Sequence, residues 1–311
     1  MTRALALLAG LAGCFSPSAP TGAACAPLTA DVRCPSGLEC IAHDGVETCE
    51  SPSGVGPDGG TGDGGDLDTD GDGVRDATDN CPGVANANQA NEDGDALGDV
   101  CDPCPPSDDN TDTDGDGVGD VCDPNPTVTG DKLVLFDGFK GSLTPTWTTT
   151  GVATTMAGDA SLLADDTVST IISVPSPSAA HVELRTSLVI DAITATGQNL
   201  GSINVIDRMQ PNTDKSVACQ LSGLVNGTQE ELRIFDANAA LIINNAPHAF
   251  ANGTQTELRL RRAGTNYACR VTGPSLELVG TSTFSPASPR IGLRVRGAAA
   301  RFRWVMIITS P

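Results

Sequence analysis

The sequence predicts a mostly β protein: a C-terminal antiparallel β-sandwich that follows an irregular acidic repeat segment and a small disulfide-rich module. Three observations lead to this prediction. Residues 131–311 alternate apolar and polar side chains in short runs, which is the period of half-buried strands. Residues 58–123 hold 20 of the chain's 39 acidic residues and a single basic residue, Arg75. The 11 cysteines indicate an oxidising compartment.

The N-terminus, residues 1–13, is typical of a short export signal. Arg3 gives the positive end, and the apolar run 4–12 is too short to span a bilayer. The run ends in Leu-Ala-Gly-Cys14, which resembles the lipobox of bacterial lipoproteins. The resemblance implies that Cys14 carries acyl chains, and Phe15, which is not acidic, favours the outer membrane or cell surface. An ordinary secretory signal with a chance cysteine is the alternative.

The first module, residues 14–50, contains four further cysteines, Cys25, Cys34, Cys40 and Cys49. Their spacing is longer than that of a zinc knuckle, so we expect two disulfides, with the connectivity left open. If Cys14 is lipidated, the ten remaining cysteines can form five disulfides without a free thiol. Residues 51–65 are rich in Gly, Ser, Pro and Asp and have the composition of a flexible linker.

Residues 66–126 repeat one acidic template three times. Oxygens at positions 1, 3, 5, 7, 9 and 12 of a loop, with Gly at position 6, form the cage that Ca²⁺ prefers. The predicted ligands are Asp68, Asp70, Asp72, Val74, Asp76 and Asp79, then Asn91, Asp93, Asp95, Leu97, Asp99 and Asp102, then Asp112, Asp114, Asp116, Val118, Asp120 and Asp123. We therefore expect three or more calcium ions. The second site is expected to be weaker, because Ala96 replaces the glycine. A solvated acidic linker is the alternative.

Proline follows position 12 of the loops, so they are not flanked by the helices of an EF-hand. The runs DNCP at 79–82, NANQ at 86–89, GDVCD at 98–102 and GDVCD at 119–123 resemble the thrombospondin type 3 repeat. The resemblance implies disulfides joining Cys81 to Cys101 and Cys104 to Cys122. It also implies a chain that wraps around ions, because the segment has too few apolar residues to fold without them.

The third module, residues 131–311, consists of short alternating runs in which Phe302, Trp304 and Met306 share one predicted face. Cys219 and Cys269 lie in strand-like runs and are expected to pair across neighbouring strands. The runs LFDGF at 135–139, LRLRRAG at 258–264 and PRIGL at 289–293 resemble the concanavalin A-like lectin and glucanase jelly rolls, which include LamG-like domains.

The sequence favours binding over catalysis. No strand carries the pair of acidic residues, separated by one residue, that glucanases of this fold use, and the acidic charge argues against nucleic acid. We expect a calcium-binding lipoprotein of the cell envelope that adheres to a glycan or a cell-surface protein. A structural spacer and a polysaccharide hydrolase are the alternatives. The candidate ligand-binding residues are Trp147, Tyr267, Arg259 and Arg261.

Overall fold

A computed structural model describes residues 39–43, 46–50, 67–143, 146–156, 158–165, 167–195, 200–273 and 275–311. The chain divides into two compact units, Met1–Gly83 and Val84–Pro311. The predicted export signal, Cys14, Cys25, Cys34 and the linker lie outside the described residues. Within the described part, no helix has the length and apolar character that crossing a membrane requires.

The first unit contains one described hairpin, formed by β1 (Glu39–His43) and β2 (Val46–Glu50). The two strands are antiparallel, and their register sets Cys40 opposite Cys49. The disulfides predicted among the four cysteines of this module stay predictions.

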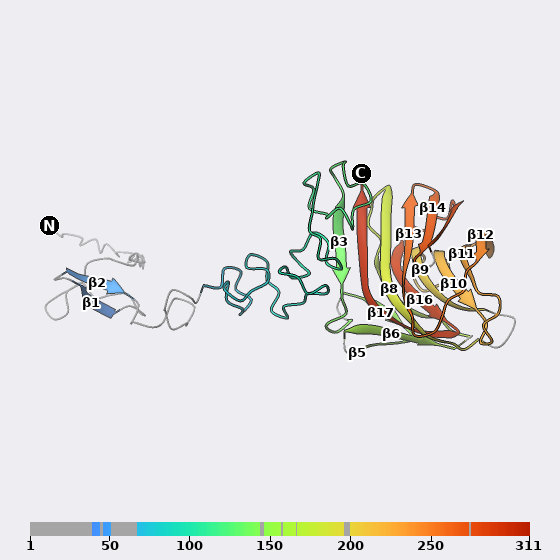
Figure 1. The fold of residues 1–311 in the computed structure, drawn as a ribbon, viewed down its shortest axis with the longest axis horizontal. Helices are drawn as coiled ribbons and strands as arrows, with labels where there is room; N and C mark the ends of the chain where they lie inside the picture. Colours follow the sequence, from blue (N-terminus) through green and yellow to red (C-terminus); the bar gives the residue numbers. More distant parts are fainter. Residues whose placement is uncertain are drawn as a thin grey trace, which may run out of the picture. The chain divides into compact units, whose positions relative to one another are not determined.

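The second unit contains fifteen of the described strands (Figure 1). They are β3 (Lys132–Asp137), β4 (Thr148–Thr150), β5 (Val152–Met156), β6 (Asp159–Ala164), β7 (Thr170–Pro175), β8 (His181–Ile193), β9 (Gly201–Met209), β10 (Val217–Gly223), β11 (Glu231–Asp236), β12 (Leu241–Pro247), β13 (Gln255–Ala263), β14 (Asn266–Val271), β15 (Leu276–Thr281), β16 (Arg290–Arg296) and β17 (Ala298–Ser310).

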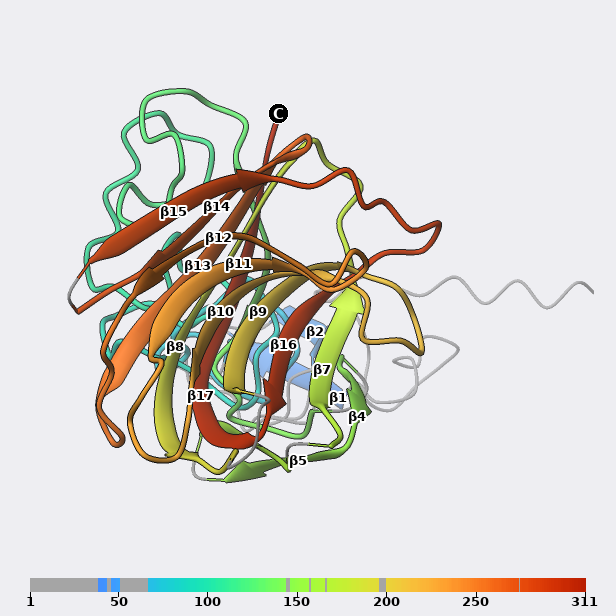
Figure 2. The same cartoon turned by 90° about the vertical axis from the view of Figure 1, so that its right-hand side faces the viewer.

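These strands form two antiparallel sheets, which confirms the predicted sandwich. The 7-stranded sheet has the order β12-β11-β10-β9-β16-β7-β4, and Figure 2 shows β12 to β7 curving side by side. The 8-stranded sheet has the order β15-β14-β13-β8-β17-β6-β5, with β3 pairing to β17. Residues 67–131, which precede β3 in the sequence, form turns and bends with no strand or helix. This is expected for a segment with few apolar side chains.

The core lies between the two sheets and includes a disulfide between Cys219 and Cys269, both fully buried. The pairing is the predicted one, but the expectation of neighbouring strands was wrong. Cys219 belongs to β10 of the 7-stranded sheet and Cys269 to β14 of the 8-stranded sheet. The bridge therefore crosses the core, because both side chains point inward from facing sheets.

The part of strand β17 that follows Arg303, residues 304–308, is buried on both faces. Its register against β8 shifts between Phe302 and Trp304, and a bulge of this kind moves the following side chains to the opposite face. Phe302 accordingly packs in the core, whereas Trp304 and Met306 pack with Cys104, Val118 and Cys122 of the acidic segment. The expectation that Phe302, Trp304 and Met306 share one face was wrong for this reason.

Candidate functional site

The first acidic loop, in the N-terminal unit, is shaped by its own carboxylates. Asp68 accepts hydrogen bonds from the backbone N–H of Gly71 (2.8 Å) and Gly73 (3.0 Å), and Asp72 accepts one from Val74 (2.8 Å). Gly73 has a φ of 94°, a conformation that side chains with a Cβ rarely adopt. The loop brings one carboxylate oxygen each of Asp68, Asp70 and Asp72 within 4.8 Å of one another.

The third loop, in the C-terminal unit, repeats this geometry. Asp112 accepts hydrogen bonds from the N–H of Gly115 (2.8 Å) and Gly117 (2.9 Å), and Gly117 has a φ of 93°. Its carboxylate lies with those of Asp114 and Asp116 inside the same 4.8 Å limit. Positions 1, 3 and 5 of loops one and three therefore converge as the template predicts.

The second loop differs at the two positions where its sequence departs from the template. Asn91 accepts a hydrogen bond from the N–H of Gly94 (2.6 Å) and donates its amide to the carbonyl of Asp95 (2.9 Å). Ala96 stays out of the left-handed region that Gly73 and Gly117 occupy. The acidic group found here consists of Asp93, Asp95 and Asp102, at positions 3, 5 and 12.

Position 9 does not join these groups in loops one and three. Asp76 accepts hydrogen bonds from the N–H (2.7 Å) and hydroxyl (2.6 Å) of Thr69, and Asp120 accepts the same pair from Thr113 (2.8 and 2.6 Å). Asp76 and Asp120 therefore bridge the two ends of their own loops instead of pointing toward positions 1, 3 and 5. The position 7 carbonyls of Val74, Leu97 and Val118, and the roles of Asp79 and Asp99 as ligands, stay predictions.

Sequence reasoning missed Asp131. It lies one residue before β3, outside the repeat template, yet one of its carboxylate oxygens lies within 4.8 Å of oxygens of Asp116 and Asp123. No sequence pattern pointed to it, because the contact depends on how the segment after the third loop turns back.

Burial raises the pKa of several of these carboxyl groups. Burial, with added repulsion from Asp93 and Asp95, raises the pKa of Asp102 to about 6. Burial, followed by the contact with the Asp131 carboxyl, raises the pKa of Asp123 to about 7. Negative charge is therefore costly where the groups converge, and a bound cation would relieve that cost.

The segment is also disulfide-bonded. Cys104 and Cys122 form the bridge that the resemblance implied. Cys81 and Cys101 are each disulfide-bonded as well, and their mutual pairing stays a prediction. The Cys104–Cys122 bridge lies in the apolar cluster that packs on β17, so it fixes the third loop against the sandwich.

A second candidate site lies on the outer face of the 7-stranded sheet. The register of five adjacent strands aligns polar residues in one row, because neighbours in register point to the same face. The row consists of Arg294, Asn204, Gln220, Arg233 and Asn245. The adjacent row on this face consists of Arg296, Ser202, Ser222 and Glu231. We call these nine residues the polar floor.

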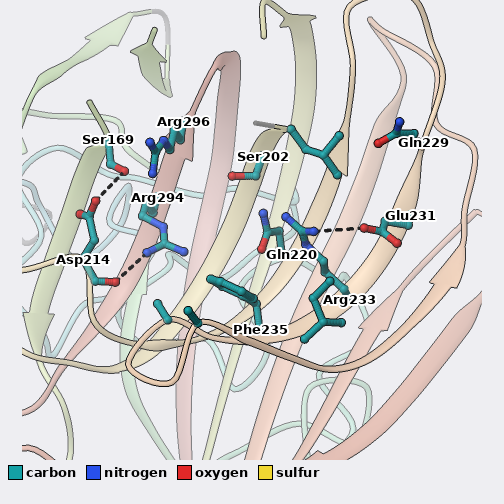
Figure 3. A pocket seen from close by; sticks show the side chains of 14 residues that line it. Ser169, Ser202, Asp214, Gln220, Gln229, Glu231, Arg233, Phe235, Arg294 and Arg296 are labelled. Atoms are coloured by element: carbon teal, nitrogen blue, oxygen red, sulfur yellow. Dashed lines mark hydrogen bonds and ion pairs between the residues drawn. The ribbon is translucent and has the colours of Figure 1, made fainter. Parts of the chain in front are cut away.

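Most of the polar floor lines an open hollow of about 680 Å³ (Figure 3). Arg294 is 6% exposed and donates to the carbonyl of Asp214 (3.0 Å) and to Oδ1 of Asn204 (3.3 Å). Arg233 forms an ion pair with Glu231 (3.1 Å) and lies over the ring of Phe235, 5.5 Å from its centroid. Aromatic and charged groups therefore line the same hollow.

Several polar atoms of the floor have unused hydrogen-bonding capacity. Oε1 of Gln220, Oγ of Ser222 and Nε of Arg233 are buried and lack a partner among the described residues. Buried polar groups are normally hydrogen-bonded, so these three atoms can bind water or a ligand. Burial lowers the pKa of Arg294 to about 10, which still leaves its guanidinium charged at neutral pH.

The predicted ligand-binding residues lie elsewhere. Trp147 and Tyr267 are each 2% exposed; Trp147 donates its indole N–H to Asp137 (2.6 Å), and the Tyr267 hydroxyl donates to Asp207 (3.3 Å). Neither ring can serve as an exposed platform for a sugar, so this expectation is corrected. Arg259 pairs with the buried carboxylate of Glu183. Arg261 lines a separate hollow of about 370 Å³ on the 8-stranded sheet, and its role stays a prediction.

Two acidic residues of β8, Glu183 and Asp191, are engaged in ion pairs. Glu183 is 2% exposed and pairs with both Arg185 and Arg259. Asp191 pairs with Arg301 at 2.9 Å. Both carboxylates belong to β8 of the 8-stranded sheet, whereas the polar floor lies on the 7-stranded sheet.

Comparison with known proteins gives one family match, which covers a short part of the chain. Residues 58–89 match the thrombospondin type 3 repeat family, which covers the first acidic loop and not the whole chain. No curated protein matches the sequence.

Among solved structures, peanut lectin with a 9-residue peptide is 11% identical with a TM-score of 0.46, covering 58% of this chain and 97% of that one. Basic winged bean lectin with Tn-antigen is 13% identical (TM-score 0.46; 58% and 100%). The carbohydrate-binding module CBM66 from Bacillus subtilis is 15% identical (TM-score 0.40; 50% and 91%). These similarities concern the arrangement of strands and say nothing of what this chain binds.

Proposed function

We propose that this protein binds calcium through its acidic loops and an acidic carbohydrate through the polar floor of its sandwich, as a lipid-anchored protein of the cell envelope. The calcium part is supported by the convergent carboxylates of the loops, whose composition suits a hard cation with oxygen ligands. Binding neutralises carboxylates that otherwise repel one another, so the loops close and the segment stiffens as ions are taken up.

The observation that carries the carbohydrate part is the row Arg294, Asn204, Gln220, Arg233 and Asn245. Gln220, Arg233 and Arg294 of this row line the hollow, where their amide and guanidinium groups offer the donors and acceptors that sugar hydroxyls need. The two arginines of this row lie three strand spacings apart, about 14 Å. This span suits several linked sugars rather than a single ring.

The charge of the hollow favours an acidic sugar. Arg233, Arg294 and Arg296 line it, against the two carboxylates of Asp214 and Glu231. The guanidinium of Arg294 contacts only neutral oxygens among the described residues. A planar guanidinium binds a carboxylate with two parallel hydrogen bonds, which are stronger than bonds to a neutral acceptor.

Calorimetry with oligogalacturonides and with the same chains as methyl esters tests this proposal, because esterification removes the charge and keeps the sugar backbone. We expect the acidic form to bind about tenfold more tightly, about 1.4 kcal/mol, and to weaken as salt is added. Sulfated and plain dextran serve as a second pair that distinguishes sulfate from carboxylate. Absence of binding to every carbohydrate would favour the spacer alternative, and turnover of the chains would favour a hydrolase.

The envelope location rests on the apolar run ending in Cys14. Growth with an alkyne-tagged fatty acid should label the wild-type chain, and Cys14→Ser should abolish the label and release the protein from membranes. Labelling that persists in Cys14→Ser would contradict the lipid anchor.

A further inference from the structure

We propose that Asp131, which belongs to the start of the sandwich, completes a calcium site with Asp116 and Asp123, so that one ion fastens the third loop to the sandwich. This inference rests on the calcium part of the proposed function. It goes further by adding a residue outside the repeat template and by giving one ion a joining role.

The three carboxylates meet in a buried place. One oxygen of each lies within 4.8 Å of the others, and Asp123 and Asp131 are only 6% and 1% exposed. Oδ2 of Asp123 is buried and has no hydrogen-bond donor among the described residues. Three carboxyl groups this close, two of them largely withdrawn from water, favour a compensating positive charge.

Hydrogen bonds orient the three carboxylates toward one another. Asp116 accepts hydrogen bonds from the backbone N–H of Gly130 (2.8 Å) and Asp131 (2.7 Å), and Asp123 accepts one from Asn125 (2.5 Å). The amide of Asn125 donates to the Asp131 carboxylate at 3.0 Å and to Oγ of Ser310 at 3.4 Å. These contacts fix the orientation of the carboxylates, and calcium accepts six to eight oxygens, so water fills the remaining positions.

The position of the site gives it a mechanical role. Asp131 directly precedes β3, and Ser310 ends β17, the two strands on which Cys104, Val118 and Cys122 pack. The same third loop therefore contacts the sandwich through an apolar cluster and through this acidic group. An ion held there ties the calcium loading of the loop to the order of β3 and of the end of β17.

Native mass spectrometry of the full chain, titrated with calcium, tests the stoichiometry. The variant is Asp131→Asn, which keeps the shape of the side chain and removes its charge. The matched control is Asp108→Asn, an exposed aspartate of the same segment outside every acidic group. We expect Asp131→Asn to bind one ion fewer than the wild type and Asp108→Asn to bind the wild-type number.

Equal ion counts in Asp131→Asn and the wild type would overturn the inference, and would mean that a shared proton satisfies Asp123 and Asp131. A wild type that binds no calcium would overturn the calcium part of the proposed function itself. Hydrogen exchange of the wild type keeps the test independent of how the variant folds. Calcium should slow exchange in residues 124–137 and 305–311. Slowing confined to residues 84–123 would contradict a joining ion.

Discussion

Arg262 of β13 and Asp207 of β9 form an ion pair across the interior of the sandwich, with Nε and Oδ2 2.7 Å apart. They are 5% and 1% exposed, and the Tyr267 hydroxyl donates to the same carboxylate oxygen at 3.3 Å. The two strands belong to different sheets. A polar contact therefore joins the two sheets.

Removing one partner of this pair is expected to be costly. Asp207→Ala should lower the free energy of unfolding by about 3–5 kcal/mol, because it leaves a buried guanidinium without its counter-charge. The double variant Asp207→Leu with Arg262→Met should recover much of the loss. Arg301→Met, which breaks an exposed pair with Asp191, serves as the control and should cost about 1 kcal/mol or less. Urea unfolding in saturating calcium measures all three; equal losses for Asp207→Ala and Arg301→Met would contradict this account.

The inter-sheet disulfide should stabilise the sandwich through the unfolded state. It closes a loop with a sequence separation of 50, for which the chain-entropy estimate is about 4 kcal/mol. Replacing Cys219 and Cys269 together by Ala should lower the unfolding free energy by up to that amount. The same replacement at Cys104 and Cys122 should act mainly on the acidic segment, which protease mapping would show. An unchanged urea midpoint for the Cys219 and Cys269 variant would contradict the prediction.

The second acidic loop should be improved by restoring the template. Ala96→Gly gives position 6 access to the conformation of Gly73 and Gly117, which costs a residue with a Cβ about 1–2 kcal/mol. We expect its calcium affinity to rise by roughly 5- to 30-fold, and Asn91→Asp to add to the gain by supplying a charge. Calcium titration followed by calorimetry measures this, with Ala87→Gly, outside the loop, as the control. A gain in Ala87→Gly equal to that of Ala96→Gly would remove the explanation.

The polar floor should lose its preference for acidic sugars when Arg233 is neutralised. Arg233→Gln should weaken binding of oligogalacturonides by about tenfold and leave binding of their methyl esters nearly unchanged, since only the former present a carboxylate. Arg303→Gln removes an exposed arginine of the 8-stranded sheet and should change neither. Equal weakening for acid and ester would mean that Arg233 shapes the hollow without contacting a charge.

The sequence predicts the parts of the structure that depend on local pattern. The acidic template places Asp68, Asp70 and Asp72 together because side chains at positions 1, 3 and 5 of one tight loop must converge. The period of two predicts a sandwich, and the strand-like run that holds Cys219 is strand β10.

The parts that depend on contacts distant in the chain were not predictable. Trp304 changes face at a bulge, and it is buried outside the core only because the third acidic loop covers β17. Asp131 becomes a neighbour of Asp116 only after the chain turns back. The polar floor depends on the register of five strands. The local sequence around Asn204 and Gln220 therefore does not show that the two residues share a row.

The central claim is that bound calcium takes the place of an apolar core in the acidic segment. Limited proteolysis of the full chain, with fragments identified by mass spectrometry, tests it most directly in chelator, in millimolar magnesium and in millimolar calcium. The account predicts cleavage within residues 67–130 in chelator and in magnesium, and protection of that stretch in calcium, with the sandwich intact throughout. The same cleavage pattern in all three conditions would contradict it.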